Sequence, residues 1–177
     1  GYLRNTSPSP TPVYITAAGP KMLELAGEVA DGVMAMVGLD PRIVKAAKEH
    51  LKIGAARSGR KIADIPIIFI THLAIDSKQE VAHSWPQQYL APGEPWLSYP
   101  SKSHYYWLRH IGIDLPDSIE PRSISDKISR QICDALGLFG TAEYCAERLE
   151  QALKETDINH IFLFPVHTID GGYIMPT

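Results

Sequence analysis

The residues best suited to chemistry form a short turn between an apolar strand pattern and a helix pattern. The turn reads Ala17-Ala18-Gly19-Pro20-Lys21. Small side chains leave its backbone N–H groups accessible, and Pro20 suits the first position of a helix, where its missing N–H costs nothing. The positive end of a helix dipole then favours an anion such as a phosphate. The hydroxyl of Thr16 and the charge of Lys21 could add to that site, although small residues in many such turns serve packing alone.

A histidine near the middle of the chain is the side chain best placed for acid–base chemistry. His72 follows an apolar run at residues 65–70, so we expect it, with Thr71, just after the end of a strand. An imidazole with a pKa near neutrality can take up or release a proton at the pH of a cell. The alternative is a histidine that only forms a hydrogen bond at the strand end. His167 follows the last apolar run and is a second candidate.

Several other kinds of site have no pattern in the sequence. It contains no Ser/His/Asp arrangement and no P-loop, and no G-x-G-x-x-G follows a strand, which disfavours nicotinamide binding of the Rossmann type. The two cysteines, Cys133 and Cys145, lack the spacing of metal ligands. We therefore predict no metal site.

The segment around the turn resembles the luciferase-like monooxygenase superfamily, in particular its coenzyme F420-dependent methylenetetrahydromethanopterin reductase-like branch. From residue 12 it reads P-V-Y-I-T-A-A-G-P, and from residue 25 it reads L-A-G-E-V-A-D-G-V. Two later segments are also similar to that branch: F-G-T-A-E from residue 139, with A-E-R from residue 146, and H-I-F-L-F-P from residue 160. The resemblance covers nearly the whole chain; its ends are specific, and its middle, about 85–120, is not.

The resemblance implies a cofactor, a reaction and a set of site residues. The cofactor would be F420, with FMN as the alternative, and the reaction a hydride transfer between it and a small organic substrate. In this family the turn lies against the phosphate-bearing tail of the cofactor, whereas the ring packs on the first half of the barrel. We therefore expect this chain to supply the tail side of the site. The predicted cofactor-binding residues are Thr16, Ala17, Ala18, Gly19 and Pro20, together with Val37 and Gly38 at the end of the next strand.

The elements that would position these residues alternate between strand and helix patterns. Apolar runs at 13–16, 32–37, 65–70 and 161–165 predict strands, and helix patterns cover 21–30, 41–58, 76–89, 104–111, 125–136 and 141–155. We expect Asp40, Asp76 and Thr141 to cap three of these helices, and Ser123 or Ser125 to start the helix that ends near residue 136. The first helix should bury Met22, Leu25, Ala26 and Val29. The second should present Ile43, Val44, Ala47, Leu51 and Gly54 or Ala55 to the core. The alternation favours an α/β fold in which four parallel strands are neighbours in chain order.

Length sets the expected architecture. The chain has 177 residues, whereas a complete (β/α)8 barrel needs about 250. We therefore expect one unit over 1–177, the C-terminal part of a TIM barrel of the bacterial luciferase type. It would have a linker-like start at 1–12, an aromatic-rich insertion at 91–122 and an irregular tail at 167–177. Whether the chain is a fragment, a separate subunit or a natural reduced form stays open.

A partial barrel is expected to associate with a partner. Unpaired strand edges invite association, so we expect either an N-terminal barrel half or a homo-oligomer. A non-catalytic binding or assembly module is the alternative to an enzyme. The net charge of −3 does not indicate binding to nucleic acid or to an anionic membrane. No apolar run is long enough for a membrane span. The two cysteines are expected to be free core thiols in a reducing cytoplasm.

Overall fold

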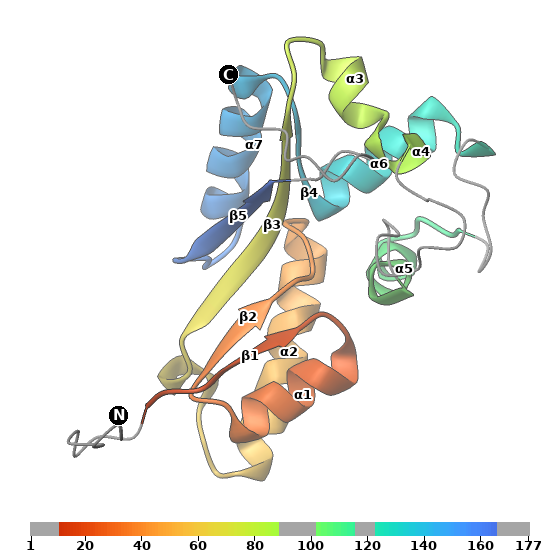
Figure 1. The fold of residues 1–177 in the computed structure, drawn as a ribbon. Coiled ribbons are helices and arrows are strands. Elements are labelled where there is room, and N and C mark those ends of the chain that lie inside the picture. Colours follow the sequence, from red (N-terminus) through yellow and green to blue (C-terminus); the bar gives the residue numbers. More distant parts are fainter. Residues whose placement is uncertain (1–10, 89–101, 116–122, 166–177) are drawn as a thin grey trace, which may run out of the picture.

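The computed structural model describes residues 11–88, 102–115 and 123–165. Most of the predicted linker, much of the predicted insertion and the tail with His167 lie outside the described residues. In chain order the elements are β1 (Tyr14–Ala17), α1 (Pro20–Val29), β2 (Gly32–Ala35), α2 (Pro41–Arg57), the 3-10 helix η1 (Ile62–Asp64), β3 (Ile67–Ile75), α3 (Gln79–His83), α4 (Trp85–Gln88), α5 (Lys102–His110), α6 (Asp126–Leu136), β4 (Gly137–Gly140), α7 (Ala142–Glu155) and β5 (Ile161–Pro165) (Figure 1).

The sheet is parallel at every pairing between the described strands. β1 pairs with β2, β2 with β3, and β3 with β5. These are the four predicted strands, and their order as parallel neighbours is confirmed. Each crossover between consecutive predicted strands contains helix, as parallel connections require. The predicted α/β architecture is therefore present in the described part of the chain.

A fifth strand, β4, was not predicted. It pairs with β3 over residues 72–75, while β5 pairs with β3 over residues 69–73. Since positions 72 and 73 pair with both, β4 and β5 must lie on opposite sides of β3. Residue 69 likewise pairs with both β2 and β5, so these two strands also lie on opposite sides of β3. β2 and β4 therefore lie on the same side of β3 and pair with successive parts of it. β4 has only four residues, the first and last of which are glycines, and its pairing partner on β3 is more than sixty residues earlier in the chain.

The length of β3 corrects one prediction about the site. Thr71 and His72 were expected to follow the strand, but β3 continues to Ile75, so both residues lie within it. The polar pair interrupts the apolar run, which made the strand look shorter in the sequence. The pairing with β4 at residues 72–75 extends it.

The buried face of α1 also differs from the prediction. Ala26 is buried as expected, but Met22, Leu25 and Val29 are 44%, 43% and 59% exposed. The face that packs inward carries Leu23, Ala26 and Gly27. α1 approaches α2 so closely that a Cβ on Gly27 would overlap the carbonyl of Leu51. The helix therefore packs through Leu23 and its small residues, whereas Met22, Leu25 and Val29 lie on the outside.

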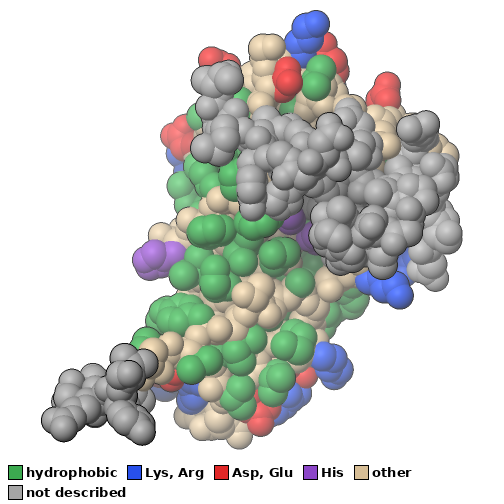
Figure 2. Space-filling view, in the orientation of Figure 1, with side chains coloured by type: hydrophobic (Ala, Val, Ile, Leu, Met, Phe, Trp, Pro, Cys, Tyr) green, Lys and Arg blue, Asp and Glu red, His purple; other side chains and the backbone are tan. Residues whose placement is uncertain are grey.

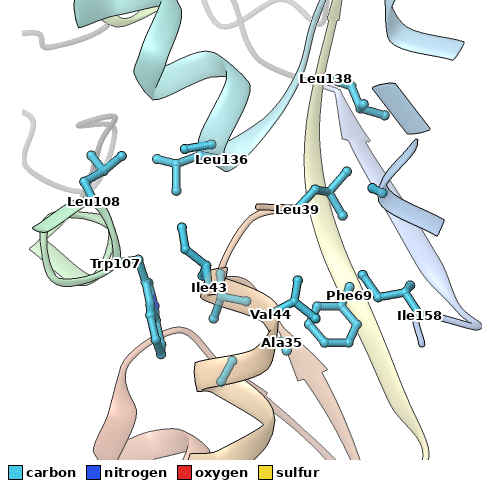
Figure 3. Packing of buried hydrophobic residues seen from close by; sticks show 14 of the residues in the cluster. Ala35, Leu39, Ile43, Val44, Phe69, Trp107, Leu108, Leu136, Leu138 and Ile158 are labelled. Carbon is cyan, nitrogen blue, oxygen red and sulfur yellow. The ribbon is translucent and has the colours of Figure 1, made fainter. Parts of the chain in front are cut away.

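The predicted core face of α2 is confirmed. Its residues Ile43, Val44, Ala47, Leu51, Gly54 and Ala55 are all buried. Figure 3 shows Ile43 and Val44 beside Leu39, Ala35 and Phe69, in the layer between α2 and the sheet. This layer supports the β1–α1 and β2–α2 turns, which lie at the carboxyl ends of β1 and β2.

Helix starts follow the predicted caps at three places. Asp40, Ser125 and Thr141 each accept a backbone N–H of the helix that follows, from Arg42, Ile128 and Tyr144 respectively. The predicted cap at Asp76 is wrong, because the carboxylate accepts the N–H of Lys78 and α3 begins only at Gln79. The single predicted helix over 76–89 is two short helices separated at Ser84, next to the proline at position 86, which has no N–H.

One face of the sheet has no helix over β1, β2 and β5 among the described residues (Figure 1). α2 and α7 lie on the opposite face. Figure 2 shows hydrophobic side chains along the uncovered face. Tyr14 on β1 is 42% exposed, and Phe162 on β5 is 47% exposed. Apolar side chains are therefore exposed at both edges of the sheet.

Candidate functional site

The β1–α1 turn has the geometry expected of an anion-binding turn. Gly19 is the N-cap of α1 in an extended conformation (φ −107°, ψ 161°), and Pro20 follows at the first helical position. No side chain caps this helix, in contrast to α2, α6 and α7. A Cβ added to Gly19 would meet only the Ser103 hydroxyl, at 3.7 Å. Backbone groups at this helix start are therefore not occupied by a capping side chain.

The turn is bonded to two other parts of the molecule. The N–H of Met36, just beyond β2, donates to the carbonyl of Ala17 (2.9 Å). The indole Nε1–H of Trp107 on α5 donates to the carbonyl of Ala18 (2.6 Å). Trp107 lies within the aromatic-rich insertion predicted over 91–122. The sequence signal was the aromatic richness of the insertion, which did not single out this residue.

The second predicted turn is packed against α6. Gly38 has a φ of +99°, a conformation that favours glycine. An added Cβ would also crowd the backbone of Ala135 and Leu136. The N–H groups of Leu39 and Asp40 both lie 3.2 Å from the carbonyl of Ala135. Val37 is fully buried. A cofactor contact at Val37 and Gly38 stays a prediction.

His72 and Thr16 lie on the same face of the sheet. Thr16 pairs with Met34 and Met34 with Ile68, and His72 is four residues beyond Ile68 on β3, so its side chain returns to that face. It is the face that carries Phe162. The structure therefore places the predicted acid–base histidine and the threonine before the turn on one side of the sheet, on strands separated by β2.

His72 has a second histidine beside it. The ring centroids of His72 and His104 are 5.8 Å apart, and Phe164 packs edge-on to His72 at the same distance. Burial, and secondarily the proximity of His72, lowers the pKa of His104 to about 3. His104 is therefore neutral at physiological pH.

Charged residues form a cluster behind the turn. Glu24 of α1 is 6% exposed and accepts a hydrogen bond from Arg57 (2.6 Å) on α2. Its other carboxylate oxygen lies 3.1 Å from Nδ1 of His50. The hydrogen bonds from Arg57 and then His50 lower the pKa of Glu24. Lys21, considered for anion binding, is an exposed side chain 3.7 Å from Glu24. The cluster holds α1 against α2.

A second buried polar cluster lies between α3, α6 and α7. The Tyr144 hydroxyl donates to the carboxylate of Asp134 (2.7 Å), and Nε2 of buried His83 lies 3.7 Å from the same oxygen. Burial, reinforced by Asp134, raises the pKa of Tyr144 to about 12. Cys133 and Cys145 are buried free thiols. Within the described ranges, no group of three or more histidine, cysteine or carboxylate side chains could hold a metal ion.

Asp31 has a structural role. Its carboxylate accepts the N–H of Val13 (2.7 Å), and its own N–H donates to the Val13 carbonyl (3.0 Å). These bonds join the chain segments that lead into β1 and β2. No helix in the described part of the chain is both long and apolar enough to cross a membrane.

Comparison with known proteins places this arrangement in a family. The model of the luciferase-like monooxygenases matches residues 3–160. The chain is 27% identical over 155 residues to the 5,10-methylenetetrahydromethanopterin reductase of Methanolobus tindarius, covering 80% of this chain and 44% of that protein. It is 32% identical over 77 residues to the same enzyme of Archaeoglobus fulgidus, covering 44% of this chain and 23% of that protein. The chain thus spans less than half of these relatives.

Two solved structures share the fold. The coenzyme F420-dependent tetrahydromethanopterin reductase of Methanopyrus kandleri superposes with a TM-score of 0.52 at 19% identity, over 88% of this chain and 45% of that one. An F420-dependent secondary alcohol dehydrogenase, in complex with an F420–acetone adduct, superposes with a TM-score of 0.56 at 16% identity, over 92% and 46%. These likenesses confirm the predicted partial luciferase-like barrel fold. With its sequence matched over residues 3–160 and its parallel sheet in place, the chain belongs to the luciferase-like monooxygenase family.

Proposed function

We propose that this chain forms the side of an F420-dependent oxidoreductase site that holds the phosphate-bearing tail of the cofactor. The observation that carries the proposal is the uncapped start of α1 at Gly19 and Pro20. Backbone amides at a helix start, reinforced by the helix dipole, suit a phosphate group. The bound deazaflavin would supply hydride transfer to or from a small organic substrate.

The relatives support F420 over FMN as the cofactor. Both solved structures described above are named as F420-dependent, and the Methanolobus relative is a reductase of a methanopterin derivative. Thr16, Ala17, Ala18, Gly19 and Pro20 would lie along the cofactor tail. His72, on the same sheet face as Thr16, is the proposed acid–base group.

Cofactor titration tests the proposal directly. The purified protein is titrated into F420 while the deazaflavin fluorescence is followed, with FMN in a parallel titration. We expect saturable binding of F420, with FMN binding more weakly. Saturable FMN binding without F420 binding would reassign the cofactor, and binding of neither would refute the proposal. Hydride transfer is then measured as the change in deazaflavin absorbance with small alcohols and methylenetetrahydromethanopterin.

One observation favours a second candidate function, that of an assembly module. Besides the uncovered sheet face, Met22, Leu25 and Val29 form an exposed apolar stripe on α1. A module of this kind would associate with a partner but would transfer no hydride. Association without cofactor binding would favour it.

A further inference from the structure

Trp107 joins α5 to the predicted cofactor turn through a part-buried hydrogen bond. The residue is fully buried, and its indole N–H donates to the carbonyl of Ala18, 89 residues earlier in the chain, over 2.6 Å. A buried indole N–H needs an acceptor. Here that acceptor belongs to the turn itself and not to a neighbouring part of α5.

The bond has a consequence for the next amide. The carbonyl of Ala18 and the N–H of Gly19 belong to one planar trans peptide unit, in which they point in opposite directions. Because Trp107 fixes the direction of the carbonyl, it also fixes the Gly19 N–H, which must point away from the indole. The Met36 N–H holds the preceding carbonyl, that of Ala17, at 2.9 Å. Two successive peptide units of the turn are thus oriented by groups outside it.

Trp107 is itself held in place by its neighbours. Tyr106 and His50 pack edge-on to the indole, with ring centroids 4.8 and 6.2 Å away. His50 also contacts Glu24 of α1, so the same residue supports both the indole and the helix that follows the turn. Figure 3 shows the indole of Trp107 extending from α5 past Ile43, toward the β1–α1 turn.

We propose that Trp107 is a positioning residue for the cofactor site. It holds the Ala18–Gly19 peptide so that the Gly19 N–H is oriented before a phosphate-bearing ligand arrives. This inference rests on the proposed function of the β1–α1 turn. Trp107 acts through the Ala18 carbonyl and does not touch the cofactor. A pre-oriented amide binds more tightly because less conformational freedom is lost on binding.

The test compares Trp107→Phe with Tyr106→Phe. The first variant keeps a large aromatic ring but removes the donor to Ala18. The second keeps the ring that packs on the indole and removes only the hydroxyl of the adjacent residue, which lies 3.5 Å from Nε2 of His50. Each protein is titrated with F420 by fluorescence and with inorganic phosphate by the 1H–15N NMR shift of the Gly19 amide. Thermal melts report on folding.

We expect Trp107→Phe to bind F420 about threefold to tenfold more weakly, as for the loss of one hydrogen bond, and Tyr106→Phe to bind as wild type does. The Gly19 amide resonance should shift in ligand-free Trp107→Phe, and its response to phosphate should decrease. In the wild type, the Trp107 indole proton should exchange slowly with solvent.

Three results would overturn the inference, and they can be told apart. If Trp107→Phe melts at a lower temperature but binds F420 and phosphate as wild type does, Trp107 serves packing only and the proposed function stands. If both variants lose affinity equally, the effect is not specific to the donor. If the wild-type protein does not bind F420, the proposed function fails and the positioning role fails with it.

Discussion

At the scale of single residues, the site depends on backbone groups that side chains orient from a distance. Gly19 contributes accessible backbone at the start of α1, and Trp107 holds the peptide that precedes it. Asp31 joins the segments before β1 and β2, so both ends of β1 are held by specific hydrogen bonds. The predicted ligand contacts at Thr16 and at residues 17–20 are consistent with this arrangement and stay predictions until a ligand is measured.

The first residue-scale prediction concerns Gly19. Its backbone conformation is one that valine adopts readily, and an added Cβ would meet only Ser103. Gly19→Val should therefore fold normally but place two methyl groups where a phosphate would approach the amides. We expect its dissociation constant for F420, measured by fluorescence titration, to rise at least about tenfold, or about 1.4 kcal/mol.

The control for this prediction is Ala63→Val. Ala63 is exposed in η1, which precedes β3 at the other end of the sheet, so its valine variant should bind F420 as the wild type does. Unchanged affinity in Gly19→Val would mean that the cofactor tail does not lie at this turn.

The second residue-scale prediction concerns pH and His104. Its pKa in the folded protein is about 3, whereas a histidine in an unfolded chain titrates near 6.5. Between these values the unfolded state binds a proton that the folded state does not, so stability should fall as the pH drops below 6.5. For one group, the free energy of unfolding changes by up to about 1.4 kcal/mol per pH unit. Urea unfolding at pH 7, 6 and 5 measures it.

A matched pair of variants separates His104 from other titrating groups. His104→Gln should show a smaller slope than the wild type between pH 6 and 5, because it no longer takes up this proton on unfolding. His110→Gln changes an exposed residue of the same helix and should leave the slope unchanged. Equal slopes for all three proteins would contradict a buried neutral His104.

At the scale of elements, the close contact of α1 and α2 determines where the turn lies. Gly27 of α1 faces the backbone around Leu51, and Gly54 of α2 faces the backbone of Glu24. Because two glycines meet opposing backbones, the axes of the two helices approach closely. Met22, Leu25 and Val29 of α1 are left on the outside. The start of α1, which forms the candidate anion site, is positioned by this contact.

Gly54→Ala tests the contact, because helix propensity and the close approach of the helices change the free energy of unfolding in opposite directions. Helix propensity alone would stabilise the protein by up to about 1 kcal/mol. The added Cβ would overlap the carbonyl of Glu24, so the helices must separate, and we expect a net loss of about 1–3 kcal/mol. Urea denaturation measures the change. Ala56→Gly, on the exposed side of α2, should cost about 0.5–1 kcal/mol through propensity alone. A stabilised Gly54→Ala protein would refute the close approach.

At the scale of the whole molecule, the exposed apolar surface predicts association. The stripe of Met22, Leu25 and Val29 on α1 lies near the β1 edge, where Val13 is 61% exposed. Apolar area left in water lacks the stabilisation of about 25 cal/mol per Å² that burial would give. An open strand edge is also a site for pairing with another strand. We expect the chain to occur as a homo-oligomer or bound to an N-terminal barrel half.

Sedimentation equilibrium at micromolar concentration measures this prediction. The double variant Leu25→Lys/Val29→Lys should shift the chain toward monomer, because lysines on the stripe would have to be desolvated in an interface. Ile53→Lys replaces an exposed apolar residue of α2 and should leave the association unchanged. A wild-type chain that sediments as a monomer and melts cooperatively would refute the prediction.

The sequence by itself determined the features that depend on neighbouring residues. The caps at Asp40, Ser125 and Thr141, the core face of α2 and the order of four parallel strands all follow from local patterns. Tertiary structure decided what depends on distant partners. β4 exists because it pairs with β3, α1 turns its small residues inward because α2 lies close, and Trp107 meets Ala18 across 89 residues of chain. The periodicity of a segment reports which residues share a face, but only the packed neighbours decide which face is buried.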